Sequence, residues 1–162
     1  MEEGNSKKII IIAVVVIAVI AVLFLVFGKK TNISYSTGKA TSDYEDVLIS
    51  NKDELDKYVA KTGLSENLET NNYKKVTLSE KYNEEFFQDH KLAIITVYED
   101  DSKEYIHAIE GVEYNSGKTE ATINYTYKSG SYLGTLGTTW FAVMLVELEP
   151  SVENVNCVNV GK

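Results

Sequence analysis

An unbroken run of 19 apolar side chains, Ile9 to Phe27, is the feature that most constrains how this chain can fold. The run has no charged, polar, proline or glycine residue, and 16 of its members are Ile, Val, Leu or Phe. A helix of this length, at about 1.5 Å per residue, spans close to the ~30 Å hydrocarbon core of a bilayer. Nothing in the remaining chain could cover a helix that is apolar on every side. The run therefore predicts a transmembrane helix over residues 9–27, whose insertion is favoured by roughly 5 to 10 kcal/mol.

A cleaved signal peptide is the alternative to a retained anchor. Lys7 and Lys8 would form its positive region, and Gly28 would end its cleavage site. The apolar run is longer than the ~7–15 residues of a signal peptide, and Lys29 and Lys30 come directly after it. These features favour a single-pass anchor in the cell membrane, with residues 1–8 as a short tail. We expect the N-terminus inside and the C-terminal domain on the extracytoplasmic side, because a short basic tail before a first apolar segment usually causes export of the chain beyond that segment.

The part after the membrane segment is acidic and contains no arginine. Residues 31–162 carry 22 Asp and Glu against 12 Lys, which gives a net charge of −10. This balance makes nucleic acid a poor partner, and the absence of guanidinium groups removes bidentate phosphate binding. A composition rich in Lys, Asn, Ile and Tyr without Arg is typical of an A/T-rich bacterial genome.

Cys157 is the only cysteine, so no internal disulfide can form and the exported domain must depend on its apolar core. The residue lies in an apolar, strand-like stretch. We expect a buried, unreactive thiol; an intermolecular bridge or a reactive thiol is the alternative.

The order of patterns predicts a polar stalk and then one domain. Residues 28–42 are rich in Ser, Thr and Gly and are predicted to form a flexible stalk, and residues 43–162 the domain. A strand over 47–50 leads into a helix that Ser50 can cap, with Asp53 as its capping-box partner, and that Gly63 can end. Residues 65–75 are predicted to be a loop, and Asn83 can cap a short helix over 84–89.

From residue 92 the pattern is that of β-strands. Strands are predicted over 92–98, 105–114 with a bulge at Gly111, 119–127, 139–148 and 155–160, with turns at 99–102 and 115–117. Residues 139–148 are apolar on both faces except at Glu147, which is typical of a central strand. The expected fold is α+β and mainly β: a twisted antiparallel sheet or small sandwich with one covering helix.

No catalytic or metal-binding motif is present in the sequence. His90 and His107 are the only histidines, no zinc-ligand spacing is present, and Gly130, Gly134 and Gly137 do not form a phosphate-binding loop. Carboxylates gather at residues 84–89 and 99–101, where helix-dipole and turn roles explain them. We therefore expect no enzyme activity, no metal and no cofactor.

The segment over residues 128–139 is the best candidate for a binding site. It is long for a hairpin loop and carries Tyr132, Leu133 and Leu136 among three glycines. Exposed apolar side chains on such a loop could enter a cleft of a partner protein, whereas the alternative is that they fold back onto the core. Trp140 is expected to pack in the core where the next strand begins.

A pattern of elements resembles the C-terminal domain of PrcB-type protease-complex subunits. It includes the helix opened by residues 50–55, the segment Tyr82-Asn-Glu-Glu-Phe-Phe87 before a strand, and a Gly-rich loop leading to Trp140 and a final apolar strand. The resemblance implies a small extracytoplasmic domain that associates with a protease or another complex subunit.

These patterns are compatible with three functional hypotheses. The first is a membrane-anchored, non-catalytic domain that binds another envelope protein through Tyr132, Leu133 and Leu136. The second is a cell-wall or carbohydrate-binding module that uses Tyr125, Tyr127 and Tyr132 as stacking platforms. The third is a hydrolase with a dispersed carboxylate site, which requires an open cleft with facing carboxylates.

Overall fold

The computed structural model describes residues 33–42, 45–134 and 137–161, which belong to a compact unit that begins at Ile33. The predicted membrane span, Ile9 to Phe27, lies outside the described residues. Among the helices that are described, none is long and apolar enough to cross a bilayer.

The described part of the chain is mainly β, with antiparallel sheet and few helices, as the sequence predicts. The elements are β1 Tyr35–Ala40, β2 Val47–Ile49, α2 Lys52–Thr62, β3 Asn67–Thr70, β4 Lys75–Thr77, α3 Leu78–Lys81, α4 Phe86–Asp89, β5 Lys91–Asp100, β6 Lys103–Tyr114, β7 Glu120–Tyr132, β8 Thr139–Leu148 and β9 Asn154–Asn159. A larger, six-stranded sheet has the order β2-β5-β8-β1-β3-β4, and a smaller, three-stranded sheet has the order β6-β7-β9.

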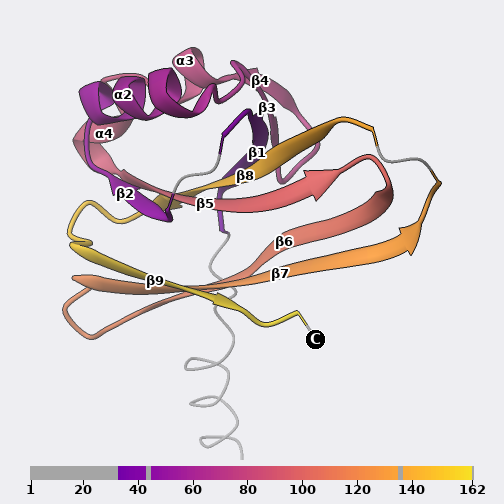
Figure 1. Cartoon of the computed structure of the whole chain (residues 1–162). Coiled ribbons are helices and arrows are strands. Elements are labelled where there is room, and N and C mark those ends of the chain that lie inside the picture. The colour runs from indigo at the N-terminus through magenta and orange to yellow at the C-terminus, as the bar shows by residue number, and fades with distance from the viewer. Residues whose placement is uncertain (1–32, 43–44, 135–136, 162) are drawn as a thin grey trace, which may run out of the picture. The chain divides into compact units, whose positions relative to one another are not determined.

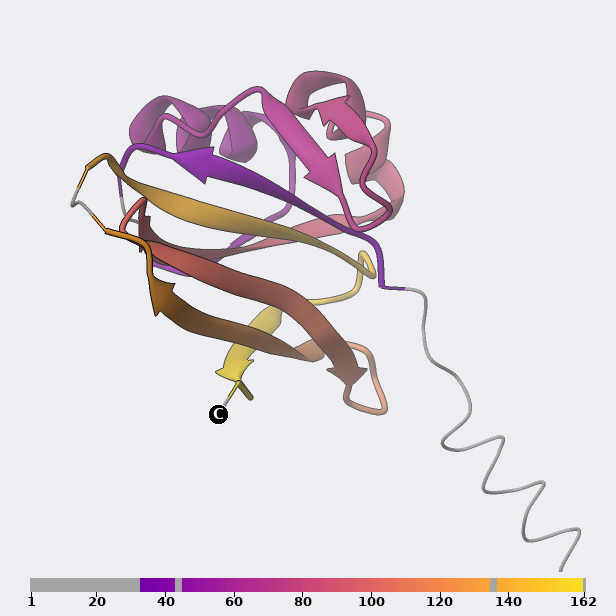
Figure 2. The same ribbon diagram turned by 90° about the vertical axis from the view of Figure 1, so that its right-hand side faces the viewer.

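The described unit has three layers. The helices cover the outer face of the larger sheet, and the smaller sheet faces its other side (Figure 1). The same layering is seen in the perpendicular view of Figure 2. Two apolar cores result, one beneath the helices and one between the sheets.

Strands β5 and β8 are neighbouring interior strands of the larger sheet, and both of their faces are apolar over most of their length. Leu92 and Leu145 contribute to the core beneath the helices, while Ile95 and Met144 contribute to the core between the sheets. All four side chains are buried. This confirms the prediction of a central strand over 139–148 and explains why neither face of that strand is polar.

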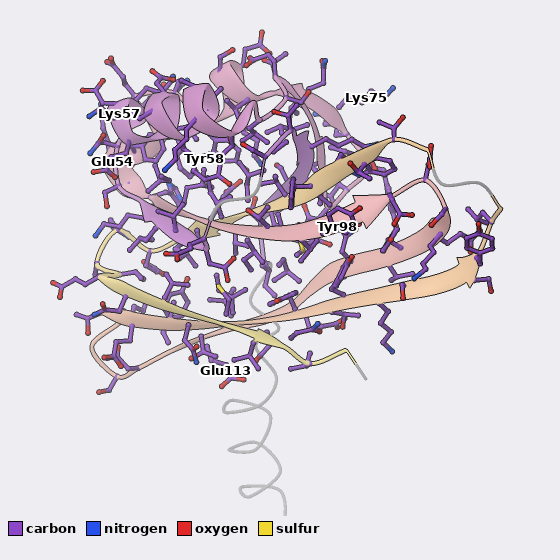
Figure 3. The ribbon with its side chains drawn as sticks, in the orientation of Figure 1. Glu54, Lys57, Tyr58, Lys75, Tyr98 and Glu113 are labelled. Atoms are coloured by element: carbon purple, nitrogen blue, oxygen red, sulfur yellow. The ribbon has the colours of Figure 1, made fainter. Side chains whose placement is uncertain are left out.

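Helix α2 begins one residue later than the sequence suggests. Asn51, not Ser50, is the N-cap, and its Oδ1 accepts a 2.9 Å hydrogen bond from the Glu54 backbone N–H. The Glu54 carboxylate in turn accepts from the Ser50 N–H at 2.7 Å, so Glu54 takes the place predicted for Asp53. Gly63 ends the helix in the left-handed conformation, as predicted, at φ 66°. Figure 3 shows Tyr58 pointing from α2 toward the larger sheet.

The prediction of a flexible stalk over residues 28–42 is wrong for residues 35–40, which form β1 inside the larger sheet. Strand β1 pairs with β8 and β3. Its Ser36 is buried and accepts a 3.0 Å hydrogen bond from the Tyr82 hydroxyl. A buried polar residue that has a partner leaves no apolar pattern in the sequence, so composition alone made this strand look like a linker.

Two further elements differ from expectation. The predicted loop over 65–75 contains β3 and, with β4, forms an antiparallel hairpin at the edge of the larger sheet. Strand β9 pairs with β7 in parallel rather than antiparallel fashion. By contrast, the bulge predicted at Gly111 is confirmed by a shift in the β6–β7 register between Ile109 and Gly111.

Candidate functional site

The predicted binding segment forms an exposed apolar tip at the end of the smaller sheet. Strand β7 extends to Tyr132, so residues 128–132 are strand and not loop. Tyr132 is 65% exposed and Leu133 59% exposed; we call this pair the tip. Leu136 lies outside the described residues. The alternative that Tyr132 and Leu133 fold back onto the core is therefore wrong.

The backbone beside the tip is held by the turn between β5 and β6. The Leu133 N–H donates to the Ser102 carbonyl at 2.6 Å, and the Thr138 N–H donates to the Asp101 carboxylate at 3.0 Å. Ser102 in turn donates its backbone N–H to Asp100 at 2.8 Å, and the Ser102 hydroxyl lowers the pKa of that carboxyl. The tip thus presents apolar side chains on an anchored backbone, which reduces the entropy lost on binding.

The turn between β5 and β6 is shorter than the sequence suggests. A charged turn was predicted over residues 99–102, but Glu99 and Asp100 belong to β5 and only Asp101 and Ser102 turn. Glu99 is only 5% exposed, because its carboxylate lies between Trp140 of the larger sheet and His107 of the smaller one. Its position leads to a second candidate site, which the sequence did not predict.

A groove of about 690 Å³ lies under the outer half of the larger sheet. We call it the Trp140 groove. Strands β1, β3 and β4 line it from above, β5 and β8 form its inner end, and His107 of β6 closes one side. Its polar and charged lining includes Thr37, Lys39, Asn67, Glu69, Lys75 and Glu99.

The groove exists because the sheets differ in size. The smaller sheet ends at β6 among the described strands; the Tyr35 end of β1 packs on the core between the sheets, while the groove lies under the rest of β1 and under β3 and β4. Side chains alternate along each strand: Ala40 and Leu68 face the helical core, and Lys39 and Glu69 therefore face the groove. The side chains on this face of β1 and β3 border the open groove, and they are therefore polar.

Glu99 organises the inner end of the groove. Its Oε2 accepts a 3.1 Å hydrogen bond from Trp140 Nε1, and its Oε1 lies 3.1 Å from His107 Nδ1. Neither Glu99 Oε1 nor His107 Nδ1 has any other polar partner among the described residues. The Lys39 ammonium lies over the indole ring, 3.9 Å from its centroid. Trp140 is thus partly exposed in the groove. The prediction that it packs in the core is wrong.

The tyrosines proposed as sugar platforms are mostly covered. Tyr125 packs against the core between the sheets. Tyr127 stacks on Tyr105, with centroids 5.8 Å apart and planes at 7°, and donates its hydroxyl to the Tyr98 carbonyl. Burial is the main cause that raises the pKa of Tyr127 to about 12. Only Tyr132 of the three proposed platforms is well exposed.

The remaining candidate residues do not converge on a site. His90 is exposed at the end of α4 and stacks on Phe86, with ring centroids 5.1 Å apart. His107 instead lies on β6 and lines the groove. Burial, and after it the nearby Asp46 carboxylate, raises the pKa of the Cys157 thiol to about 12. Glu84, Glu85 and Asp89 are exposed on the helical layer. Within the described ranges no three His, Cys, Asp or Glu residues come together as a metal site.

The groove residues that sequence reasoning missed come from segments far apart in the chain. Glu99 and Trp140 are 41 positions apart, and Lys39 lies in the segment assigned to the stalk. One signal was present in the sequence. The alternation of the strand places Glu99 on the same inward face as apolar residues, and a carboxylate in such a position is expected to have a buried polar partner.

No protein-family model, curated protein or solved structure matches this chain.

Proposed function

We propose that this chain is a single-pass membrane protein whose extracytoplasmic domain is non-catalytic and binds another envelope protein, with the tip as a main contact. The observation that carries the proposal is the adjacent exposure of Tyr132 and Leu133, at 65% and 59%. The membrane anchor rests on the apolar run over residues 9–27. The resemblance to PrcB-type subunits suggests a protease or a complex subunit as the partner.

The size and placement of the tip support a protein contact. Aromatic and large aliphatic side chains that enter a pocket on a partner contribute most of the binding energy at many interfaces. Burying Tyr132 and Leu133 would contribute on the order of 3 kcal/mol, which is about a hundredfold in affinity. Because the hydrogen bonds from Leu133 and Thr138 anchor the backbone, little of this energy is lost in ordering the segment.

Hydrolysis is the less favoured alternative. A general acid or base needs a carboxylate that can reach the substrate. Glu99, the buried carboxylate of the groove, already has one oxygen bonded to Trp140 and the other facing His107. Its observed contacts suit positioning of the indole better than proton transfer to a ligand.

A wall-sugar module is the second alternative, and one observation favours it: a partly exposed indole lies in a polar groove. Aromatic rings in such settings can stack on sugar faces. Lys39, however, covers one face of this ring, so a sugar would have to displace the ammonium or use the other face.

The test is co-purification from the cells that produce the protein. The tagged full chain is cross-linked in intact cells, extracted in detergent and compared with the double variant Tyr132→Ala/Leu133→Ala. Tyr73→Ala is the matched control, because Tyr73 is 86% exposed in the β3–β4 turn. We expect the double variant to lose the partner and the control to retain it.

Two results would contradict the proposal. Equal recovery of the partner with the tip variant would show that the tip is not the contact. Binding of the purified full chain to wall glycan, with no protein partner recovered from any variant, would favour the sugar-binding alternative.

A further inference from the structure

Strand β6 has a free edge that borders the Trp140 groove. It is the outermost strand of the smaller sheet and, among the strands that the structure describes, pairs only with β7. Its pairing is irregular between Lys103 and Tyr105 and again between Ile109 and Gly111. The stretch from Tyr105 to Ile109 is therefore a regular edge with backbone groups available for pairing, and His107 at its centre faces the groove.

The space next to this edge is where a fourth strand of the smaller sheet would lie. The part of β1 and β3 that carries Thr37, Lys39 and Glu69 stands above it and lines the groove. A groove of about 690 Å³ can hold several residues of an extended peptide. Strand addition of this kind takes its affinity from main-chain hydrogen bonds and its specificity from alternate side chains.

The charges in the groove indicate which side chain such a peptide would carry. Glu99 is engaged by Trp140 and His107. Glu69 lies directly opposite Lys75 in the β3–β4 pairing, so each of these charges has an opposite charge beside it, without a direct ion pair among the described residues. Lys39 forms no ion pair with any carboxylate in the described ranges, and its contact there is with the Trp140 ring. Lys39 pairs with Ala142 in the β1–β8 register and so has no acidic residue directly opposite it, which leaves it as the groove cation for a ligand.

We propose that the Trp140 groove binds an extended segment of a partner polypeptide, which adds to β6 along Tyr105–Ile109 and places a carboxylate side chain against Lys39. This inference deepens the proposed function, since it supplies a second contact and the chemistry of the segment. A second copy of this chain is a poor occupant because the domain, at a net charge of −10 over residues 31–162, repels itself.

The test uses a random library of ten-residue peptides displayed on phage and selected against the full chain in detergent micelles. Trp140 is the only tryptophan, so its fluorescence reports binding in the groove directly. Selected peptides are then synthesised and titrated. We expect them to share one acidic position, to change Trp140 emission, and to bind Lys39→Ala about tenfold more weakly.

Matched variants separate this inference from the proposed function. Lys57→Ala removes an exposed lysine from α2, in the layer beyond the larger sheet (Figure 3), and should bind the peptides as the wild type does. Tyr132→Ala/Leu133→Ala should also keep the peptides, even though it loses the partner protein. Alternate backbone amides within 105–109 should become protected from hydrogen exchange when a peptide is bound.

Several outcomes would overturn the inference while leaving the tip assignment intact. These are a selection that enriches no peptide, enriched peptides that bind Lys39→Ala unchanged, and peptides that leave the 105–109 amides unprotected. A change in Trp140 emission caused by N-acetylglucosamine oligomers, but by no peptide, would identify the groove as a sugar site instead.

Discussion

The hydrogen bond between Glu99 and Trp140 should be measurable as a coupling in the free energy of unfolding. Glu99 is 5% exposed and its Oε2 lies 3.1 Å from Trp140 Nε1. A hydrogen bond to a charged group contributes roughly 1.5 to 3 kcal/mol, and truncating a buried acceptor also leaves the donor without a partner. Because His107 faces the same carboxylate, we expect Glu99→Ala to destabilise the domain by about 3 kcal/mol.

The coupling itself is isolated by a double-mutant cycle. Trp140→Phe keeps a ring in the groove and removes the N–H donor, so the pair Glu99→Ala and Trp140→Phe reports their interaction. We expect a coupling energy of about 1.5 kcal/mol, at the lower end of the range for charged bonds because Trp140 is partly exposed.

The assay is urea unfolding of the full chain in micelles, monitored by circular dichroism because Trp140→Phe removes the only tryptophan. A domain of this size should be stable by about 5–15 kcal/mol, so each variant should remain folded. A coupling below about 0.5 kcal/mol, with unchanged unfolding slopes, would refute the assignment of Glu99 as the residue that positions Trp140.

Further predictions concern other parts of the domain. Because the pKa of Cys157 is raised to about 12, its alkylation by iodoacetamide at pH 8 should be at least about a hundredfold slower in the folded than in the urea-unfolded chain; equal rates would contradict the half-buried position of the thiol. The pKa of Asp100 is lowered by the Ser102 hydroxyl, so this carboxylate stabilises the fold above its unfolded pKa of about 3.9, and its contribution is lost as the pH falls through the lower folded value. Ser102→Ala should raise the Asp100 pKa in a carbon-13 NMR titration, and an unchanged value would argue against the turn geometry. Gly63→Ala should destabilise the domain by about 1–2 kcal/mol in urea unfolding, since φ is 66° and an added Cβ meets Thr41 Oγ1; no loss would argue against the left-handed cap. Protease added to intact cells should digest the C-terminal domain, and protection would reverse the proposed orientation.

The parts of the fold that could be predicted are those in which local pattern and burial agree. Strand β8 is apolar on both faces, and Gly63 and Gly111 stand where a helix cap and a bulge need them. In each case the physical requirement acts within a few residues. Periodicity and turn chemistry therefore identify the element without knowledge of its neighbours.

The parts that could not be predicted depend on long-range pairing. Strand β1 is polar because Ser36 has a buried partner in Tyr82 and because Thr37 and Lys39 face the groove. Residues 67–70 looked like loop because Asn67 and Glu69 face the same uncovered space. The groove-facing polar side chains thus made β1 and β3 difficult to recognise and form the candidate site.

For the tip, the sequence singled out Tyr132 and Leu133, which are exposed, but it predicted a loop where β7 continues. Glycines and polar residues suggested a loop over 128–139, whereas β7 continues to Tyr132 opposite Lys103. The register shift between Lys103 and Tyr105 interrupts the alternation that would have indicated a strand.

The central claim is that one partner polypeptide contacts both the tip and the edge of β6. Hydrogen–deuterium exchange of the full chain, alone and with its co-purified partner, tests this most directly. We predict slower exchange in segments 105–109 and 130–134 together, with α2, Lys52–Thr62, unchanged. Protection confined to α2, or absent from both predicted segments, would contradict the account.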